Sequence, residues 1–161
     1  MNTFFTAKYY ANVFKLAIIH IVTFSISLYC VGQTRTIERL KDNIRIATNS
    51  NQKLAALLTL CDLGYTLNPD TLFTYATQAK KLAANNHDLH TEVQTMFYQS
   101  GALTTKGLID SSLNVANKCL EILDKNKIDD LGLRANIFNQ KGRCFMRKNK
   151  TIPANQPLFD I

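Results

Sequence analysis

Two histidines and an aspartate lie close together near the middle of the chain. His87, Asp88 and His90 form the segment HDLH, and on one helix the two histidines would share a face. Imidazole nitrogens and a carboxylate oxygen are ligands that Zn²⁺ takes in proteins, but no third ligand is evident. The segment favours an exposed turn in which Asp88 caps the next helix. A metal-binding or enzymatic helical domain around His87 and His90 is the alternative.

Other reactive residue types occur without the patterns that catalysis needs. Ser111 and Ser112 have no histidine placed to activate them in a recognisable nucleophile motif. Asp129 and Asp130 are typical of a helix start, where acidic groups meet the positive end of the helix dipole. The glycines are isolated, so no phosphate-binding loop is present. We therefore predict that the protein is not an enzyme and that it holds no cofactor and no metal.

Three cysteines follow the N-terminal region, and each stands among apolar or small residues. No two of Cys61, Cys119 and Cys144 form a C-x-x-C pair, so their spacing indicates neither zinc nor a redox pair. An odd number of cysteines cannot all pair within one chain. We expect small, buried packing residues.

The first 32 residues have the parts of a secretory signal peptide. Lys8 and Lys15 precede the apolar run LAIIHIVTFSISLYCV, which is short for a membrane span and ends in small residues. Cleavage after Gly32 would leave Gln33 as the new N-terminus, in the periplasm or cell envelope. An uncleaved signal anchor, or lipidation of Cys30, remains the alternative. The membrane would then be contacted only through this segment.

Charge and composition indicate one folded domain rather than a nucleic-acid binder. The chain has 161 residues and a formal charge of +7, with 46% hydrophobic residues. Basic residues are interspersed with acidic ones until the C-terminal region, and no aromatic platform or reading helix accompanies them. We expect no binding of nucleic acid.

The remaining chain reads as a series of helices without any sustained strand pattern. The pattern NPDT predicts a helix start with Asn68 as cap and Pro69 in the first turn, and Asp110 is expected to cap a later helix. The expected helices span residues 36–47, 53–67, 71–85, 90–105, 111–126 and 131–149. The expected core residues of the last four are Leu72, Tyr75, Ala76, Ala79, Leu82, Val93, Met96, Phe97, Gly101, Leu113, Ala116, Cys119, Leu120, Leu123, Leu133, Ile137, Gly142 and Phe145.

The segments YATQAKKLAANN and VANKCLEILDKN carry the same apolar rhythm about one helix pair apart. Superposing Ala76 on Ala116 brings Ala79 onto Cys119, and further along Gly101 finds a partner in Gly142. Small residues at such positions let neighbouring helices approach closely. The pattern predicts an all-α fold of antiparallel helix-hairpin repeats with a period of about 40 residues.

This pattern resembles the tetratricopeptide repeat, over roughly residues 36–150. The resemblance implies a short right-handed α-solenoid, with a repeat domain at 33–150 and an irregular tail at 151–161. The segment IERLKDNIRIATNSNQKLAALLTLCDLGYTLNPDTLFTYATQAKKLA also looks like the start of the exported repeat regions of bacterial sensor proteins that carry a histidine kinase or a DNA-binding output domain.

That family resemblance implies a curved platform for protein or peptide contacts, serving as the input part of a signalling protein. The binding face would be lined by the first helices of each pair. Its expected residues are the polar and aromatic ones left exposed there: Tyr65, Gln94, Tyr98, Gln99, Lys106, Asn136 and Gln140.

The C-terminal end of the pattern lacks a partner helix. Pro153 and Pro157 interrupt the tail KTIPANQPLFDI, which has no helical rhythm. A stacked repeat needs a neighbour or a cap over its last face. We expect self-association through the last helix, or a fragment of a longer sensor without an independent role.

Overall fold

The computed structural model describes residues 15, 18, 20 and 35–151, apart from the side chains of residues 65, 150 and 151. Contacts divide the chain into two units, Met1–Asp42 and Asn43–Ile161. Residues 35–46 form a helix that crosses this boundary. Apart from residues 15, 18 and 20, the predicted signal peptide at 1–32 lies outside the described residues, and so do residues 152–161 of the tail.

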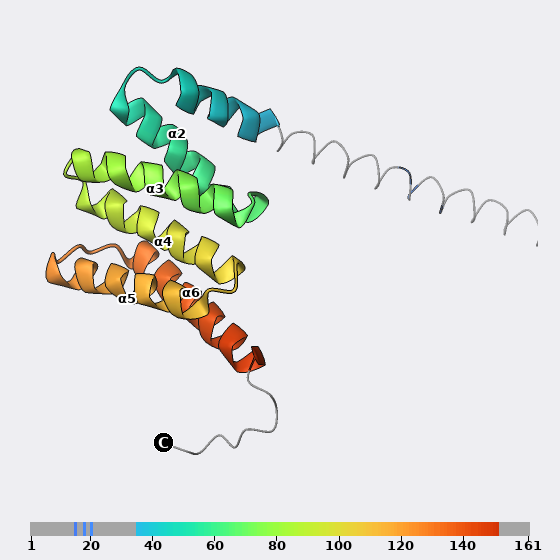
Figure 1. Cartoon of the computed structure of the whole chain (residues 1–161), viewed down its shortest axis with the longest axis vertical. Coiled ribbons are helices and arrows are strands. Elements are labelled where there is room, and N and C mark those ends of the chain that lie inside the picture. The colour runs from blue at the N-terminus through green and yellow to red at the C-terminus, as the bar shows by residue number, and fades with distance from the viewer. Residues whose placement is uncertain (1–14, 16–17, 19, 21–34, 152–161) are drawn as a thin grey trace, which may run out of the picture. The chain divides into compact units, whose positions relative to one another are not determined.

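All regular secondary structure in the described residues is helical (Figure 1). After residues 35–46, the elements are α2 (Ser50–Asp62), the short 3-10 helix η1 (Gly64–Thr66), α3 (Pro69–Asn85), α4 (Leu89–Thr105), α5 (Ile109–Lys125) and α6 (Leu131–Thr151). Consecutive helices pack against each other, and α4 also contacts both α2 and α6. Contacts to the next helix and to the one after are the pattern of stacked hairpins. The predicted all-α repeat fold is therefore confirmed, and the helices that we expected to be first in each pair correspond to α2, α4 and α6.

Helix starts follow the capping residues in three of the four predicted places. Asn68 accepts a hydrogen bond from the backbone N–H of Asp70, and Pro69 is the first residue of α3. Asp88 accepts from the N–H of Thr91 at the start of α4. Asp130 accepts from the N–H of Leu133 at the start of α6. Each side chain satisfies a backbone donor that the first helical turn leaves unpaired.

The prediction that Asp110 caps α5 is wrong. The cap position is Leu108, which makes no side-chain capping bond, and Asp110 lies inside the first turn. Gly107 has a φ of 80°, and the N–H of Leu108 bonds the carbonyl of Leu103. Because of this tight turn at the C-terminal end of α4, α5 begins at Ile109, one residue before Asp110.

The turns after α3 and α5 share one geometry, with a non-glycine residue in the left-handed region. His87 has a φ of 56° and Lys127 a φ of 54°. In both turns the next residue returns a hydrogen bond to the helix, from Asp88 N to the carbonyl of Ala83 and from Ile128 N to that of Leu123. These bonds satisfy carbonyls that a helix end leaves unpaired.

The buried positions of α3 and α5 repeat at an interval of 40 residues. Leu72, Ala76, Ala79 and Ala83 are buried in α3, and Ser112, Ala116, Cys119 and Leu123 are buried in α5. In each helix these positions are spaced by three and four residues, so they form a single stripe. The small residues of that stripe permit close packing between neighbouring helices.

Some predicted core residues lie elsewhere. A Cβ atom built on Gly101 or on Gly142 meets nothing within 4 Å, so these glycines are not at close crossings. Phe145 is 51% exposed, whereas its neighbour Cys144 is fully buried. The prediction is wrong for Phe145 because α6 buries a stripe that passes through Cys144, and adjacent residues on a helix point about 100° apart.

Candidate functional site

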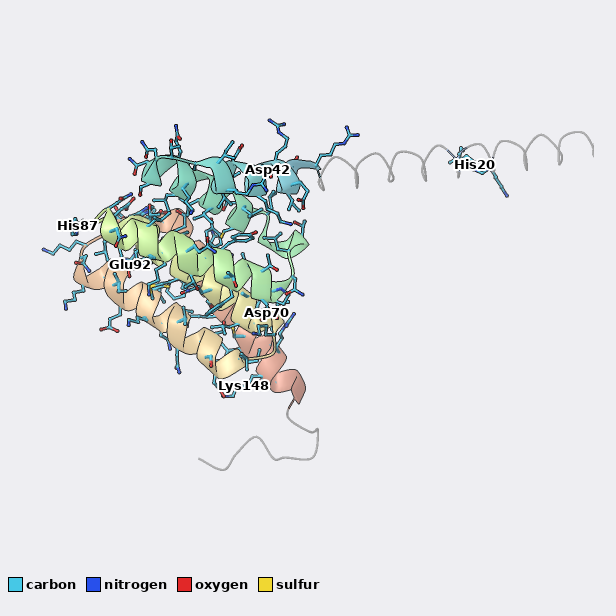
Figure 2. The ribbon with its side chains drawn as sticks, turned by 45° about the horizontal axis from the view of Figure 1, so that its top comes forward. His20, Asp42, Asp70, His87, Glu92 and Lys148 are labelled. Atoms are coloured by element: carbon cyan, nitrogen blue, oxygen red, sulfur yellow. The ribbon has the colours of Figure 1, made fainter. Side chains whose placement is uncertain are left out.

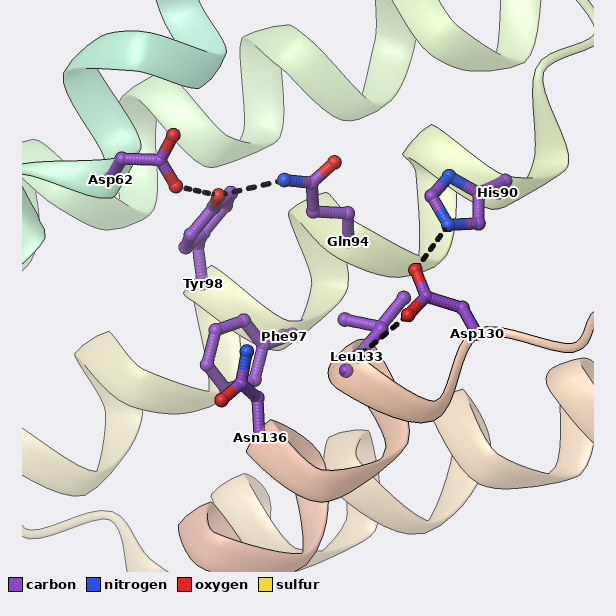
Figure 3. A pocket seen from close by; sticks show the side chains of 9 residues that line it. Asp62, His90, Gln94, Phe97, Tyr98, Asp130, Leu133 and Asn136 are labelled. Atoms are coloured by element: carbon purple, nitrogen blue, oxygen red, sulfur yellow. Dashed lines mark hydrogen bonds and ion pairs between the residues drawn. The ribbon is translucent and has the colours of Figure 1, made fainter.

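A cavity of about 310 Å³ opens on the face formed by α2, α4 and α6 (Figure 3). This volume is at the lower end of the range for ligand pockets, and suits one side chain or a short segment. Its lining comes from all three helices and from the turn before α6. The lining residues are Asp62, His90, Gln94, Phe97, Tyr98, Asp130, Gly132, Leu133 and Asn136.

The first polar group of the cavity joins α2 to α4. The hydroxyl of Tyr98 donates to Oδ1 of Asp62 and accepts from Nε2 of Gln94, which lies 2.9 Å away. Tyr98 is 8% exposed, and burial together with the bond to Asp62 raises the pKa of its hydroxyl. Tyr98 therefore stays a neutral donor that holds the Asp62 carboxylate at one edge of the cavity.

The second polar group joins α4 to α6. Oδ2 of Asp130 lies 2.7 Å from Nε2 of His90, and Oδ1 accepts from the N–H of Leu133 at 2.8 Å. The bond from Leu133, followed by that from His90, lowers the pKa of Asp130 below its usual range. This carboxylate is therefore charged at neutral pH, and it stands at the edge of the cavity opposite Asp62.

The lining carries negative charge although the chain as a whole is basic. Asp62 and Asp130 are its acidic residues, and no lysine or arginine lines the cavity. His90 is the one lining residue that can become positive. Between the acids lie the Phe97 ring and the amides of Gln94 and Asn136 (Figure 3). The site thus offers an aromatic surface and hydrogen-bonding groups between two carboxylates.

The structure brings together three of the seven predicted binding residues. Gln94, Tyr98 and Asn136 line the cavity. Gln99 and Lys106 lie toward α3, where Gln99 donates to Thr77 and Lys106 pairs with Asp70. The side chain of Tyr65 lies outside those that the structure describes.

Gln140 is not available on the surface, contrary to expectation. It is 2% exposed and contributes to a buried polar cluster between α4, α5 and α6. Its Nε2 donates to the hydroxyl of Thr104, which also lies 2.7 Å from the hydroxyl of Ser112. Ser112 in turn contacts Ser100 at 2.8 Å and the Cys144 thiol at 3.3 Å. A buried amide is stable here because its donor is paired.

The three residues of the metal-binding alternative do not converge. His87 is exposed at the end of α3 (Figure 2), whereas Asp88 is engaged by Thr91 and His90 by Asp130. No group of three histidine, cysteine or acidic side chains within the described residues could hold a metal ion. His87 lies in the turn after α3 with a φ of 56°, whereas His90 lies in α4.

The three cysteines are buried and free, as expected. Burial raises the pKa of the Cys61 thiol to about 12, and it does the same for Cys119. Neither thiol is therefore an activated nucleophile.

Sequence reasoning did not predict four of the residues that line the cavity. It gave no role to Asp62, and it assigned His90 to the metal-binding alternative, Phe97 to the core and Asp130 to a helix start. The 40-residue interval carried a signal for one pair, because His90 and Asp130 lie 40 residues apart and contact each other. No local pattern distinguishes Asp62 from an ordinary exposed acid at a helix end.

A second, more open hollow of about 600 Å³ lies where α2 meets the turn between α3 and α4. Asn86 there donates to Asn51 at 2.9 Å, and both Asp88 oxygens bond Thr91. Its polar groups largely satisfy each other, so it offers less for a ligand than the first cavity.

One face of α6 exposes large apolar side chains. Leu131 is 76% exposed, Phe138 57% and Phe145 51%. Lys141 lies over the Phe138 ring, with its Nζ 5.8 Å from the ring centroid. Counted from the caps Asp88 and Asp130, the counterpart of Phe138 on α4 is Met96, which is buried against residues of α5 and α6. The exposed face of α6 is therefore an apolar stripe without a covering helix in the described residues.

Comparisons of the chain with protein-family models, with curated proteins and with solved structures find no match. Within the described residues, no helix has the length and apolar character needed to cross a membrane.

Proposed function

We propose that this chain is a helical-repeat module that binds a protein or peptide on the face formed by α2, α4 and α6. The observation that carries the proposal is the cavity of about 310 Å³ that three successive first helices share. The amides of Gln94 and Asn136 and the carboxylates of Asp62 and Asp130 line it. Concave faces with a few placed polar groups are typical of ligand sites.

The wider setting of the module follows from the sequence resemblance. We propose a tetratricopeptide-type repeat that is exported to the cell envelope and forms the input part of a signalling protein. Support comes from the signal-peptide pattern of residues 1–32 and from the buried stripe of small residues that α3 and α5 share. N-terminal sequencing of protein recovered from a bacterial envelope is expected to begin at Gln33, and a chain that begins at Met1 would favour an anchor.

Selection from a random peptide display library on the full chain tests the binding function. The Asn136→Trp variant fills the cavity from an exposed position on α6, and Asn139→Trp adds the same ring to an exposed position outside the lining. Peptides selected on the unaltered chain should lose binding to the first variant and keep it with the second. Circular dichroism checks that both variants remain helical. If no selected peptide distinguishes the two variants, the cavity is not the binding site.

A further inference from the structure

We infer that the cavity between α2, α4 and α6 accepts a basic side chain, arginine in preference to lysine, presented by the partner peptide. This inference rests on the proposed peptide-binding function and adds the chemical class of the recognised residue. It follows from the charge and the layout of the lining (Figure 3).

The two carboxylates decide which ligands fit. An acidic side chain would face Asp62 and Asp130, and like charges at an interface are strongly unfavourable. An apolar side chain would displace water from both carboxylates without replacing its hydrogen bonds. A cationic side chain supplies donors and neutralises the charge. A cation is therefore the occupant that leaves no lining group unsatisfied.

Both carboxylates are held in place before a ligand arrives. Tyr98, whose ring is buried, donates to Oδ1 of Asp62. Leu133 N and His90 hold the two oxygens of Asp130 at 2.8 Å and 2.7 Å. Groups that are already oriented lose little freedom on binding, which favours affinity.

The shape of the site favours arginine over lysine. Phe97 and Asn136 line the cavity together with the two acids, and in the view of Figure 3 the amide of Asn136 overlaps the Phe97 ring. A guanidinium is planar, stacks on aromatic rings and presents five donors in fixed directions, whereas an ammonium is a compact point charge. A guanidinium on Phe97 can therefore direct donors toward both edges.

The charge of the rest of the protein restricts the ligand further. The formal charge of the chain is +7, so the field around it repels a run of basic residues. The cavity is an acidic site in a chain whose formal charge is positive. We therefore expect recognition of an isolated basic residue rather than a polybasic segment.

The test is a titration of the full chain with capped pentapeptides, Gly-Ser-X-Ser-Gly, where X is arginine, lysine, glutamate or leucine. Nuclear magnetic resonance of the side-chain amides of Gln94 and Asn136 reports occupancy of the cavity. The variants Asp62→Asn and Asp130→Asn keep the size of the side chain and one accepting oxygen while removing the charge. Asp110→Asn is the matched control, because it removes an exposed acid on α5 outside the cavity.

We expect the arginine peptide to bind about tenfold more tightly than the leucine or glutamate peptides, with lysine between, since a charge-assisted bond contributes about this factor. Each cavity variant should lose about fivefold to tenfold in affinity for the arginine peptide, and Asp110→Asn less than about twofold. Equal binding of all four peptides, or unchanged affinity in both cavity variants, would overturn the inference.

The display selection distinguishes failure of the inferred preference for a basic residue from failure of the proposed peptide-binding function. One outcome is that the selected peptides lose binding to Asn136→Trp and yet show no enrichment of basic residues. That outcome would support peptide binding in the cavity and refute the preference for a basic residue. Absence of any cavity-dependent peptide, with no amide shifts at roughly 10 mM pentapeptide, would refute both.

Discussion

Replacing His87 or Lys127 by glycine should stabilise the protein. Both residues occupy the left-handed region, with φ values of 56° and 54°, at the ends of α3 and α5. A residue with a Cβ atom is disfavoured there by about 1–2 kcal/mol. Glycine removes that strain but raises the entropy of the unfolded chain by about 0.5–1 kcal/mol. The net gain expected for each variant is about 0.5–1 kcal/mol.

The gain converts into a measurable change in melting temperature. Unfolding entropy is about 2.1 cal/mol/K per residue, so a unit of roughly 110 residues changes by about 4 °C for each kcal/mol. Each single variant should melt about 2–4 °C higher, and His87→Gly with Lys127→Gly about 4–8 °C higher if the two turns act independently. Thermal unfolding followed by circular dichroism at 222 nm, a standard wavelength for helix, measures these shifts.

Two controls separate backbone strain from loss of a side chain. His87→Ala removes the imidazole but keeps a Cβ atom, so it should bring no gain. Gly107 is the reverse case, with a φ of 80° and nothing within 4 Å of an added Cβ, and Gly107→Ala should lower the melting temperature by about 2–4 °C. Lower melting temperatures for both glycine variants would refute the reasoning, as would stabilisation by Gly107→Ala.

Three further predictions concern the core, the acid response and the last helix. Ser112→Ala should reduce the free energy of unfolding by about 1–3 kcal/mol in urea titrations, because it removes the partner of buried Ser100 and Thr104. The control Ser111→Ala, at an exposed position, should change the free energy of unfolding by less than about 0.5 kcal/mol. Equal effects of the two variants would contradict the role of the buried cluster. The pKa values of Asp88 and Asp130 are lowered in the folded state, chiefly by bonds to Thr91 and to the Leu133 N–H, so their contribution to stability is present above the usual pKa of 3.8 and is lost as pH falls through the folded values. Urea titrations between pH 5 and pH 2.5 should accordingly show a shallower loss for the Asp88→Asn, Asp130→Asn double variant than for the unaltered chain, and identical slopes would argue against these caps. If copies of the chain associate through the apolar stripe of α6, the sedimentation coefficient of the unaltered chain should rise with protein concentration. Phe138→Glu should abolish this rise, whereas Asn139→Glu, also at an exposed position, should not. An unaltered chain that is monomeric at all concentrations would refute the association.

Much of the fold could be predicted because its signals are local. Asn68, Asp88 and Asp130 cap helices through bonds to backbone N–H groups two or three residues away. The three-and-four spacing of small and apolar residues identifies the buried stripe of α3 without reference to any distant residue. The segments YATQAKKLAANN and VANKCLEILDKN have the same spacing of apolar residues, which predicts stacked helix pairs. Each of these amphipathic helices needs a neighbouring helix to cover its apolar face.

The candidate site was only partly predictable, because its main pairs join residues far apart in the chain. Gln94, Tyr98 and Asn136 were selected as polar or aromatic residues on the first helices, and they do line the cavity. The expectation that these residues are exposed was wrong for Tyr98, which is 8% exposed, and for Gln140, which is 2% exposed. Helical spacing indicates that a helix is amphipathic, but the packing of α6 against α4 and α5 decides which stripe is covered.

The sequence by itself therefore determined the helices, most of their caps, the 40-residue period and the buried cysteines. Only the tertiary structure decided that Asp62 meets Tyr98, that His90 meets Asp130 and that Phe145 faces outward. The physical reason is that capping and amphipathic patterns are settled within one or two helical turns. The rotation and register of one helix against its neighbours depend instead on all the side chains that meet between them, and those choices place the charges around the cavity.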